Sequence, residues 1–171
     1  MLKSTLGIAI AFSLCAVAHA ANQGQGVVNF KGTVIDAPCG IDPDSADQTI
    51  DFGQISKSLL TAGGISKAQD LDIKLVNCDT SKVTKKGVTL TFSGNTVNGV
   101  ATELETAGPT NTAIVINGYG SDITFGQPTD NIKLTNGDNT LRFQSWVKQA
   151  STKTAAEGDF TAVANFNLAY E

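Results

Sequence analysis

The sequence predicts an all-β protein, and three observations support this. Apolar residues occupy every second position in several short runs, Asn-Gly pairs lie between runs, and no long segment after residue 20 has a helical period. The pairs Asn98-Gly99, Asn117-Gly118 and Asn136-Gly137 supply the positive φ that tight turns need. Seven or eight short strands separated by such turns are typical of a β-sandwich of immunoglobulin type.

The strands are expected in eight segments. In chain order they are residues 28–34, 49–53, 71–77, 88–92, 112–116, 123–125, 141–147 and 160–170. The apolar period shifts by one residue between Phe143 and Trp146, which indicates a β-bulge. A single helical turn is expected near residues 58–60, because Gly63-Gly64 would end anything longer.

The first twenty residues have the pattern of a secretory signal peptide. Lys3 gives a positive start, residues 6–17 are apolar but too few to span a bilayer, and Ala18-His19-Ala20 is a small-x-small cleavage site. We therefore expect residues 1–20 to be removed, so that the mature chain begins at Ala21 and is exported. An uncleaved anchor helix is the alternative.

Two cysteines remain after residue 20, Cys39 and Cys78. In an exported protein such a pair indicates a disulfide. The bond would contribute about 4 kcal/mol by restricting the unfolded chain. A catalytic dithiol is the alternative, but the mature chain has no C-x-x-C sequence.

Charge and hydropathy exclude two classes of partner. Lys3 is one of 12 basic residues, and its removal leaves 11 against 16 acidic ones, a formal net charge of −5. Nucleic-acid binding needs lysine and arginine gathered on one face, so we expect no nucleic-acid partner. After residue 20 no stretch is long and apolar enough to cross a membrane, so no span is expected in the mature chain.

The mature chain has no visible catalytic or metal-binding constellation. Its only histidine, His19, lies in the signal peptide, so none remains for a catalytic triad or for zinc. A cluster of aspartates has spacing that suggests calcium, but the EF-hand glycine and closing glutamate are absent, and a surface turn is expected at Asp42, Asp44 and Asp47. We expect no cofactor and no metal.

The last fourteen residues form the clearest period-two run of the chain. Gly158 opens the run, and every even position that follows is apolar: Phe160, Ala162, Ala164, Phe166, Leu168 and Tyr170. One face of this strand therefore belongs to a core, and its backbone needs a partner.

The first mature residues suggest what that partner is. Their even positions are Gly24, Gly26, Val28, Phe30, Gly32 and Val34, a strand pattern with gaps where side chains are absent. One interpretation is a frayed terminus that leads into the first strand. The other is an arm shaped to lie in the groove of another molecule.

Together these features resemble a known family, the pilin subunits of chaperone–usher pili, closely so the major rod subunits of P and type 1 pili. Four features carry the resemblance. They are Gly32-Thr-Val-Ile-Asp-Ala-Pro-Cys39, Ile50-Asp-Phe-Gly-Gln-Ile55, Leu75-Val-Asn-Cys78, and the terminal run with its glycine fourteenth from the end and its penultimate Tyr170. The match spans nearly the whole mature chain.

The resemblance implies an immunoglobulin-like sandwich that lacks its seventh strand and is completed by a donor strand from another chain. It divides the chain into a signal peptide (1–20), a donor-strand extension (21–31) and a pilin domain (32–171). A periplasmic chaperone would lend a strand first. At an outer-membrane usher, the arm of the next pilin subunit would then replace that strand.

The resemblance also assigns roles to residues. Val28 and Phe30 would fill the groove, with Gly24 and Gly26 where it is shallow. The groove would be bordered by the residues of the terminal run, from Gly158, Phe160, Ala162 and Ala164 to Phe166, Leu168 and Tyr170. Basic chaperone residues would anchor the carboxylate of Glu171. The arm departs from the family pattern at its start, where Ala21, Asn22 and Gln23 stand in place of an apolar residue.

The function implied is a structural subunit that polymerises into the shaft of an adhesive fimbria on the surface of a Gram-negative bacterium. A minor adaptor, tip or terminator subunit of the same system is the alternative. A two-domain tip lectin does not fit a chain with one domain's length and an arm. A periplasmic enzyme on a sandwich fold would need histidines that the mature chain lacks.

Overall fold

The computed structural model describes residues 26–171. The chain divides into two units between Val34 and Ile35, and only the second, Ile35–Glu171, contains helices and strands among the described residues. The signal peptide expected at 1–20 lies outside the described residues. So does the first part of the expected arm, including Gly24.

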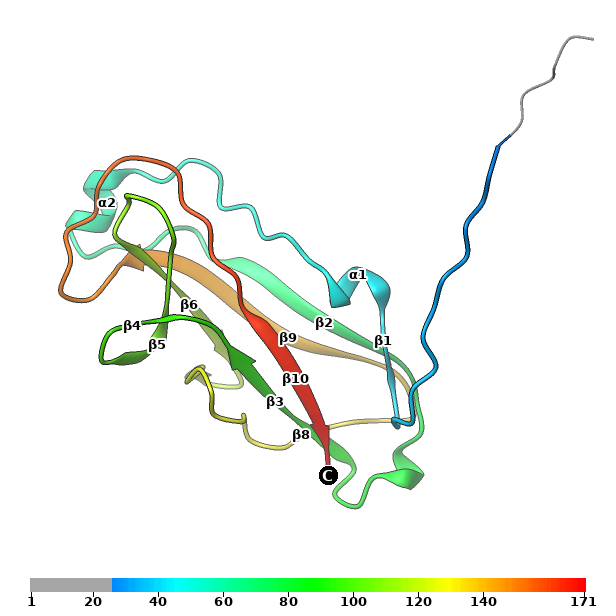
Figure 1. Ribbon diagram of the computed structural model, residues 1–171. Coiled ribbons are helices and arrows are strands. Elements are labelled where there is room, and N and C mark those ends of the chain that lie inside the picture. The colour runs from blue at the N-terminus through cyan, green and yellow to red at the C-terminus, as the bar shows by residue number, and fades with distance from the viewer. Residues whose placement is uncertain (1–25) are drawn as a thin grey trace, which may run out of the picture. The chain divides into compact units, whose positions relative to one another are not determined.

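The larger sheet is antiparallel and has the strand order β1-β2-β9-β6-β5-β4, with β7 paired to β6 (Figure 1). Its long central strands are β2 and β9, which pair over most of their length. The members are β1 (Gly40–Ile41), β2 (Gln69–Cys78), β4 (Thr96–Val97), β5 (Val100–Glu105), β6 (Thr112–Gly118), β7 (Ser121–Asp122) and β9 (Gly137–Gln149).

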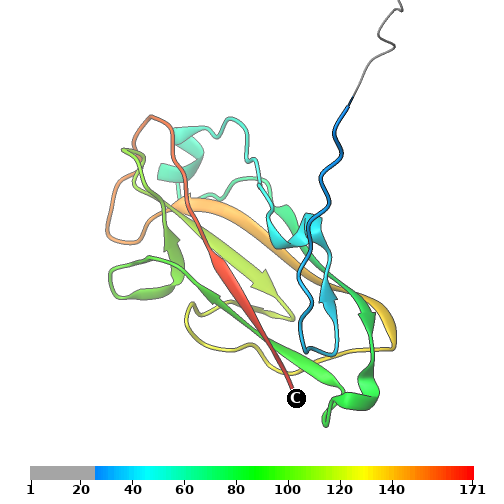
Figure 2. The same cartoon turned by 45° about the vertical axis from the view of Figure 1, so that its right-hand side comes forward.

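The smaller sheet has three strands, in the order β10-β3-β8. They are β3 (Gly87–Ser93), β8 (Ile132–Lys133) and β10 (Asn165–Tyr170). Strand β10 pairs with β3 on one side only, so it forms an edge of this sheet; Figure 2 shows the two strands side by side.

The two sheets pack face to face around one main core. Alternation along each strand turns every second side chain inward. The larger sheet contributes Ile73, Leu75, Leu141 and Phe143, and β3 contributes Val88, Leu90 and Phe92. The Phe92 and Phe143 rings meet edge to face with centroids 5.3 Å apart, an arrangement that aromatic pairs prefer. The predicted all-β sandwich is confirmed.

Short helices and a disulfide complete the fold. The helices are α1 (Pro43–Ala46), α2 (Lys57–Thr61) and the single 3-10 turn Thr80–Lys82. The Asp44 N–H donates to Asp42 Oδ1 at 3.0 Å, so this aspartate caps α1 in the surface turn predicted there. The helical turn near residue 58 is also confirmed, and Cys39 and Cys78 form the expected disulfide.

Three predicted strands do not form. Residues 26–36 take no helix or strand, so the expected strand at 28–34 has no ladder partner here. Residues 49–53 are also outside any strand, although Gln48, Ile50 and Phe52 are half-buried and the residues between them exposed. Ile123 and Phe125 lie in the core, but on a loop. The residue types that favour strands also favour burial, so composition alone does not predict a hydrogen-bonded ladder.

Other boundaries also differ from prediction. The bulge predicted between Phe143 and Trp146 does not form, since Ser145 takes the inward position between Phe143 and Val147 and leaves Trp146 on the opposite face. The β2–β9 ladder instead shifts register between Leu75 and Cys78. The turn expected at Asn117-Gly118 falls one pair later, at Tyr119 and Gly120, whose φ angles are 54° and 93°. The terminal strand begins at Asn165 because β3 ends at Ser93. Strand β5 was not predicted.

Candidate functional site

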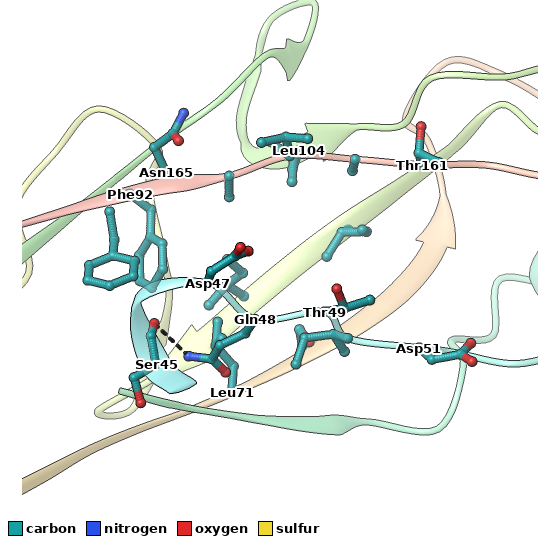
Figure 3. Close-up of a pocket in the computed structure, with 18 of the residues that line it drawn as sticks. Ser45, Asp47, Gln48, Thr49, Asp51, Leu71, Phe92, Leu104, Thr161 and Asn165 are labelled. Atoms are coloured by element: carbon teal, nitrogen blue, oxygen red, sulfur yellow. Dashed lines mark hydrogen bonds between the residues drawn. The ribbon is translucent and has the colours of Figure 1, made fainter. Parts of the chain in front are cut away.

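An open groove of about 810 Å³ runs along one side of the sandwich (Figure 3). One wall is residues 45–52, and the other is residues 160–166. The floor consists mainly of core side chains of the two sheets, namely Leu71, Phe92, Leu104, Ile114, Ile116 and Ser145. The groove therefore exposes the hydrophobic core of the domain itself.

The wall formed by residues 160–170 has one incompletely covered face. Its even-numbered side chains are half-buried and its odd-numbered side chains are exposed. The register pairs Phe166 with Phe92 and Leu168 with Leu90. On β3, Phe92 and Leu90 are only 2% and 0% exposed. The same apolar face is thus fully buried on the inner strand and only partly buried on the edge strand.

Both walls also contain backbone without partners. Within the part of the chain that the structure describes, residues 48–52 make no backbone–backbone hydrogen bond, and neither do residues 162–164. Unpaired N–H and C=O groups along a strand edge form a template for another strand. Because two such segments flank one apolar floor, the groove has the features of a sheet position that lacks its strand.

A loop between β5 and β6 fixes the upper end of the 160–170 wall. Ala107 and Thr161 exchange two backbone hydrogen bonds, of 2.8 and 3.1 Å. Next to this bridge, Gly158 has φ of 137°, and a Cβ there would lie 2.5 Å from Pro109 Cγ. Glycine at position 158 therefore permits the close approach of the two segments, and it does not line the groove.

An ion pair and two backbone bonds hold the lower end of the same wall. The Lys85 N–H donates to the Glu171 carbonyl oxygen at 2.7 Å, and the Glu171 N–H donates to Gly87 O at 3.2 Å. Lys85 Nζ lies 2.6 Å from Glu171 Oε2. Next to this end, burial raises the pKa of the Tyr170 hydroxyl above its ordinary value.

The described part of the arm, residues 26–31, presents apolar side chains to solvent. Val28 is 73% exposed and Phe30 is 92% exposed. Both stand at even-numbered positions of the period-two run, as do Gly26 and Gly32, which carry no side chain. Large exposed apolar side chains at alternate positions of one segment indicate that the segment binds another surface.

Most of the predicted site residues come together at one edge. Phe160, Ala162, Ala164 and Phe166 line the groove, while Leu168 and Tyr170 pack against the core beyond it. Gly158 and Glu171 lie at the two ends of the wall. The sequence reading missed the opposite wall, since residues 49–53 were predicted as a paired strand. Side chains 48–52 do alternate between half-buried and exposed, but a sequence pattern does not report whether a strand has a neighbour.

Neither a metal centre nor a membrane-crossing helix is found among residues 26–171. No group of three or more histidine, cysteine or acidic side chains in that range lies close enough to hold a metal ion. None of its helices is both long and apolar enough to cross a membrane.

Comparison with known proteins places the chain in a family. The chain matches the Fimbrial protein family over residues 28–171. It is 49% identical to the Pap fimbrial major pilin protein of Escherichia coli, over 100% of both chains. It is 44% identical to the Fimbria A protein of Serratia marcescens, over 99% of this chain and 98% of the relative.

Solved structures agree with these sequence relatives. A subunit in the structure of a chaperone–usher pilus superposes with a TM-score of 0.82 at 51% identity, covering 87% of this chain and 97% of that one. The P pilus rod subunit PapA superposes with a TM-score of 0.74 at 48% identity, covering 79% and 100%. The fold is an incomplete immunoglobulin-like sandwich, and the chain belongs to the Fimbrial protein family.

Proposed function

We propose that this chain is a structural subunit that polymerises by donor-strand exchange into the shaft of a fimbria. Each subunit would accept a strand in its groove and donate its own arm to a neighbour. It is a building block, and no catalytic step is involved. The full-length similarity to the Pap fimbrial major pilin protein supports this role.

The observation that carries the proposal is the apolar groove between two segments of unpaired backbone. A strand laid between residues 48–52 and 162–164 would pair with both, and its alternate side chains would cover the open core. Main-chain hydrogen bonds would supply affinity, and the fit of alternate side chains would supply specificity.

The arm has the composition that such a groove requires. Val28 and Phe30 stand two residues apart, so both would point to the same side of an extended strand. Burying each would stabilise the joint by about 1.5–3 kcal/mol before the cost of ordering the arm. Gly24 and Gly26 would let the backbone approach where the groove has little depth.

Exchange between arm and groove would generate a filament. The arm and the groove are different surfaces, so the interface is head-to-tail and need not close into a ring. However many subunits join, the chain keeps one free arm at one end and one free groove at the other. The same joint can therefore repeat along a shaft at the surface of a Gram-negative cell.

An unfilled groove explains the need for a chaperone. An exposed core and an open strand edge promote aggregation. We infer that a periplasmic chaperone occupies the groove first and that an outer-membrane usher exchanges it for the arm. The similarity to subunits of a chaperone–usher pilus supports this order of events. Basic chaperone residues that bind the carboxylate of Glu171 would contact the end already held by Lys85.

A minor adaptor or terminator subunit is the second candidate from sequence. The 49% identity to the Pap fimbrial major pilin protein across both whole chains favours a place along the shaft. Immunogold labelling separates the two: a rod subunit labels the whole shaft, and a minor subunit labels only the tip or the base.

Deletion of residues 21–31 tests the proposal. The truncated chain should still bind chaperone, because its groove is intact, but it should not donate to a neighbour. Full-length Phe30→Asp is a second variant, in which a charge replaces a groove-filling side chain while chain length is kept. Fibres formed by the truncated chain alone, seen by electron microscopy, would refute the donor-arm role.

A further inference from the structure

Three Asn-Gly pairs occur in the chain, and the fold places them in different environments. Asn98-Gly99 connects β4 to β5, Asn117-Gly118 ends β6, and Asn136-Gly137 leads into β9. The pair is chemically labile because glycine has no Cβ to hinder its own amide nitrogen. That nitrogen can attack the amide carbon of the preceding asparagine, provided that the asparagine side chain is free to move.

Asn117 is restrained by its neighbours. Its Nδ2 donates to Asp122 Oδ1 at 2.7 Å, and the residue is half-buried. Both members of the pair lie in the β6–β7 ladder, opposite Asp122 and Ser121. The Phe143 ring also packs against Gly118, where a Cβ would lie 2.3 Å from Phe143 Cδ1. Attack here would require breaking the ladder.

Asn136 is exposed, but hydrogen bonds restrain its side-chain amide. Its Oδ1 accepts hydrogen bonds from the Thr80 N–H at 2.9 Å and from Thr80 Oγ1 at 2.7 Å. These bonds tie the side chain to the 3-10 turn Thr80–Lys82. The Asn136 side chain must therefore release Thr80 before its amide carbon can turn to the Gly137 nitrogen.

Asn98 has no such restraint. It is exposed at the turn that joins the paired residues Val97 and Val100. Among residues 26–171, no hydrogen-bond partner is found for the Asn98 side chain or for the Gly99 N–H. Gly99 has φ of 79°, and no atom lies within 4 Å of where its Cβ would be. Both reacting groups are thus accessible and unhindered.

We propose that Asn98 is a site of spontaneous deamidation in the folded protein. The Gly99 nitrogen forms a bond to Asn98 Cγ, the Cγ–Nδ2 bond breaks, and ammonia leaves, which gives a succinimide. Water then opens the ring. Cleavage of the bond from Cγ to the Gly99 nitrogen gives aspartate, and cleavage at the backbone carbonyl carbon gives isoaspartate.

The modification changes the edge of the larger sheet. It places a negative charge at an exposed turn, and isoaspartate adds a methylene to the main chain within that turn. Strand β4 has only two residues, lies at the end of the sheet order and is joined to β5, its one partner strand in that order, by this turn. Aged protein should therefore be heterogeneous at the β4–β5 edge, while the β6–β7 turn and the start of β9 stay intact.

Peptide mapping by mass spectrometry tests the inference on the full chain with its disulfide intact. The protein is incubated at mildly alkaline pH in heavy-oxygen water, which labels only the acid groups formed during incubation. Deamidation at Asn98 should be at least about tenfold faster than at Asn117 or Asn136, the factor expected where side-chain hydrogen bonds must first break. Equal rates at the three sites in the folded protein would overturn the proposal.

Two variants and an unfolded control make the test specific. Gly99→Asn keeps a residue that tolerates positive φ and adds a side chain beside the attacking nitrogen, so deamidation at position 98 should slow. Asp122→Ala should accelerate deamidation at Asn117 and leave Asn98 unchanged. In the reduced, urea-unfolded chain the three rates should converge. A folded protein that is inert at Asn98, while its unfolded chain reacts there, would contradict the proposal.

Discussion

At the scale of single residues, Gly158 shows how a residue outside the groove determines the shape of its wall. The glycine lies beside the Ala107–Thr161 bridge, in a backbone region that only glycine adopts readily. The wall begins two residues later, at Phe160. A side chain at position 158 would displace the loop that fixes this end.

We expect Gly158→Ala to destabilise the folded protein by about 1–3 kcal/mol from backbone strain, with a further cost from the contact with Pro109. Urea unfolding measures the loss. Gly126→Ala is the matched control, since Gly126 has φ of 83° and open space around it. If the two variants lose the same stability, the contact with Pro109 has no role.

Glu103 is a second residue whose role lies outside the groove. It is 3% exposed, and its carboxylate accepts hydrogen bonds from Lys148 Nζ and from the Ser151 N–H and Oγ. Burial raises the pKa of the carboxyl, but these hydrogen bonds outweigh that effect and hold the pKa below its ordinary value. The bonds attach β5 to the end of β9.

A lowered pKa in the folded state means that ionised Glu103 contributes stability above pH 4.5, its ordinary pKa. That contribution is lost as the pH falls through the folded value. We expect Glu103→Gln to cost about 1–3 kcal/mol at neutral pH and to weaken the acid dependence of urea unfolding. Glu105→Gln, which breaks an exposed pair with Lys153, should cost under about 1 kcal/mol. Equal losses would contradict the assigned role of Glu103.

At the scale of elements, alternation predicted which side chains turn inward better than it predicted which segments form ladders. Residues 71–77 and 88–92 were correctly read as strands because both have neighbours in the fold. Residues 48–52 and 162–164 have the same period but no hydrogen-bonded strand neighbour among the described residues. Period two reflects one apolar face, whereas a strand also requires a hydrogen-bonded partner.

The groove itself followed from family resemblance rather than from local pattern. Periodicity identified the wall at residues 160–170, and the disulfide followed from the pair of cysteines. The floor residues Ser145 and Ile114 were not predicted, because their positions depend on the packing of two sheets. Strand β5 was missed because the alternation of Val100–Glu105 is interrupted by polar residues.

Two neighbouring residues of the wall at 160–166 allow a direct test of the groove as the binding surface. Ala162 lines the groove and Val163, the next residue, is exposed on the other side. We expect Ala162→Trp to fill the groove and abolish chaperone binding and polymer formation, while Val163→Trp leaves both intact. Co-purification with the chaperone measures the effect. Normal chaperone binding by Ala162→Trp would place the binding surface elsewhere.

The disulfide links the short strand β1 to the long strand β2. It joins Cys39 to Cys78 at a sequence separation of 39, between the start of β1 and the end of β2. Replacing both cysteines by serine should cost about 4 kcal/mol on the chain-entropy model. Urea unfolding checks this value, and a loss below about 1 kcal/mol would show that β1 is held by other contacts.

At the scale of the whole molecule, the domain is incomplete alone, and we propose that neighbouring copies complete it. Its core is open along one side, and the strand that would close it is proposed to come from another molecule. Head-to-tail exchange of this kind has no fixed end point. Polymer length is then set by the supply of subunits that can both accept and donate.

This predicts how truncated subunits act on a growing fibre. A chain without residues 21–31 accepts an arm but donates none, so it can stand only at the end of a fibre, where each truncated chain starts a separate fibre. Mean fibre length in electron micrographs should fall steadily as the truncated fraction rises. Fibre lengths that are independent of this fraction would show that the arm is dispensable for assembly.

Backbone hydrogen exchange tests the central claim most directly. A chain lacking residues 21–31 is mixed with a synthetic peptide of residues 21–34, and exchange is followed at individual amides. The account predicts that residues 48–52 and 162–164, which have no backbone partner in the described chain, become protected when the peptide binds. Peptide binding that leaves both segments unprotected would contradict the account.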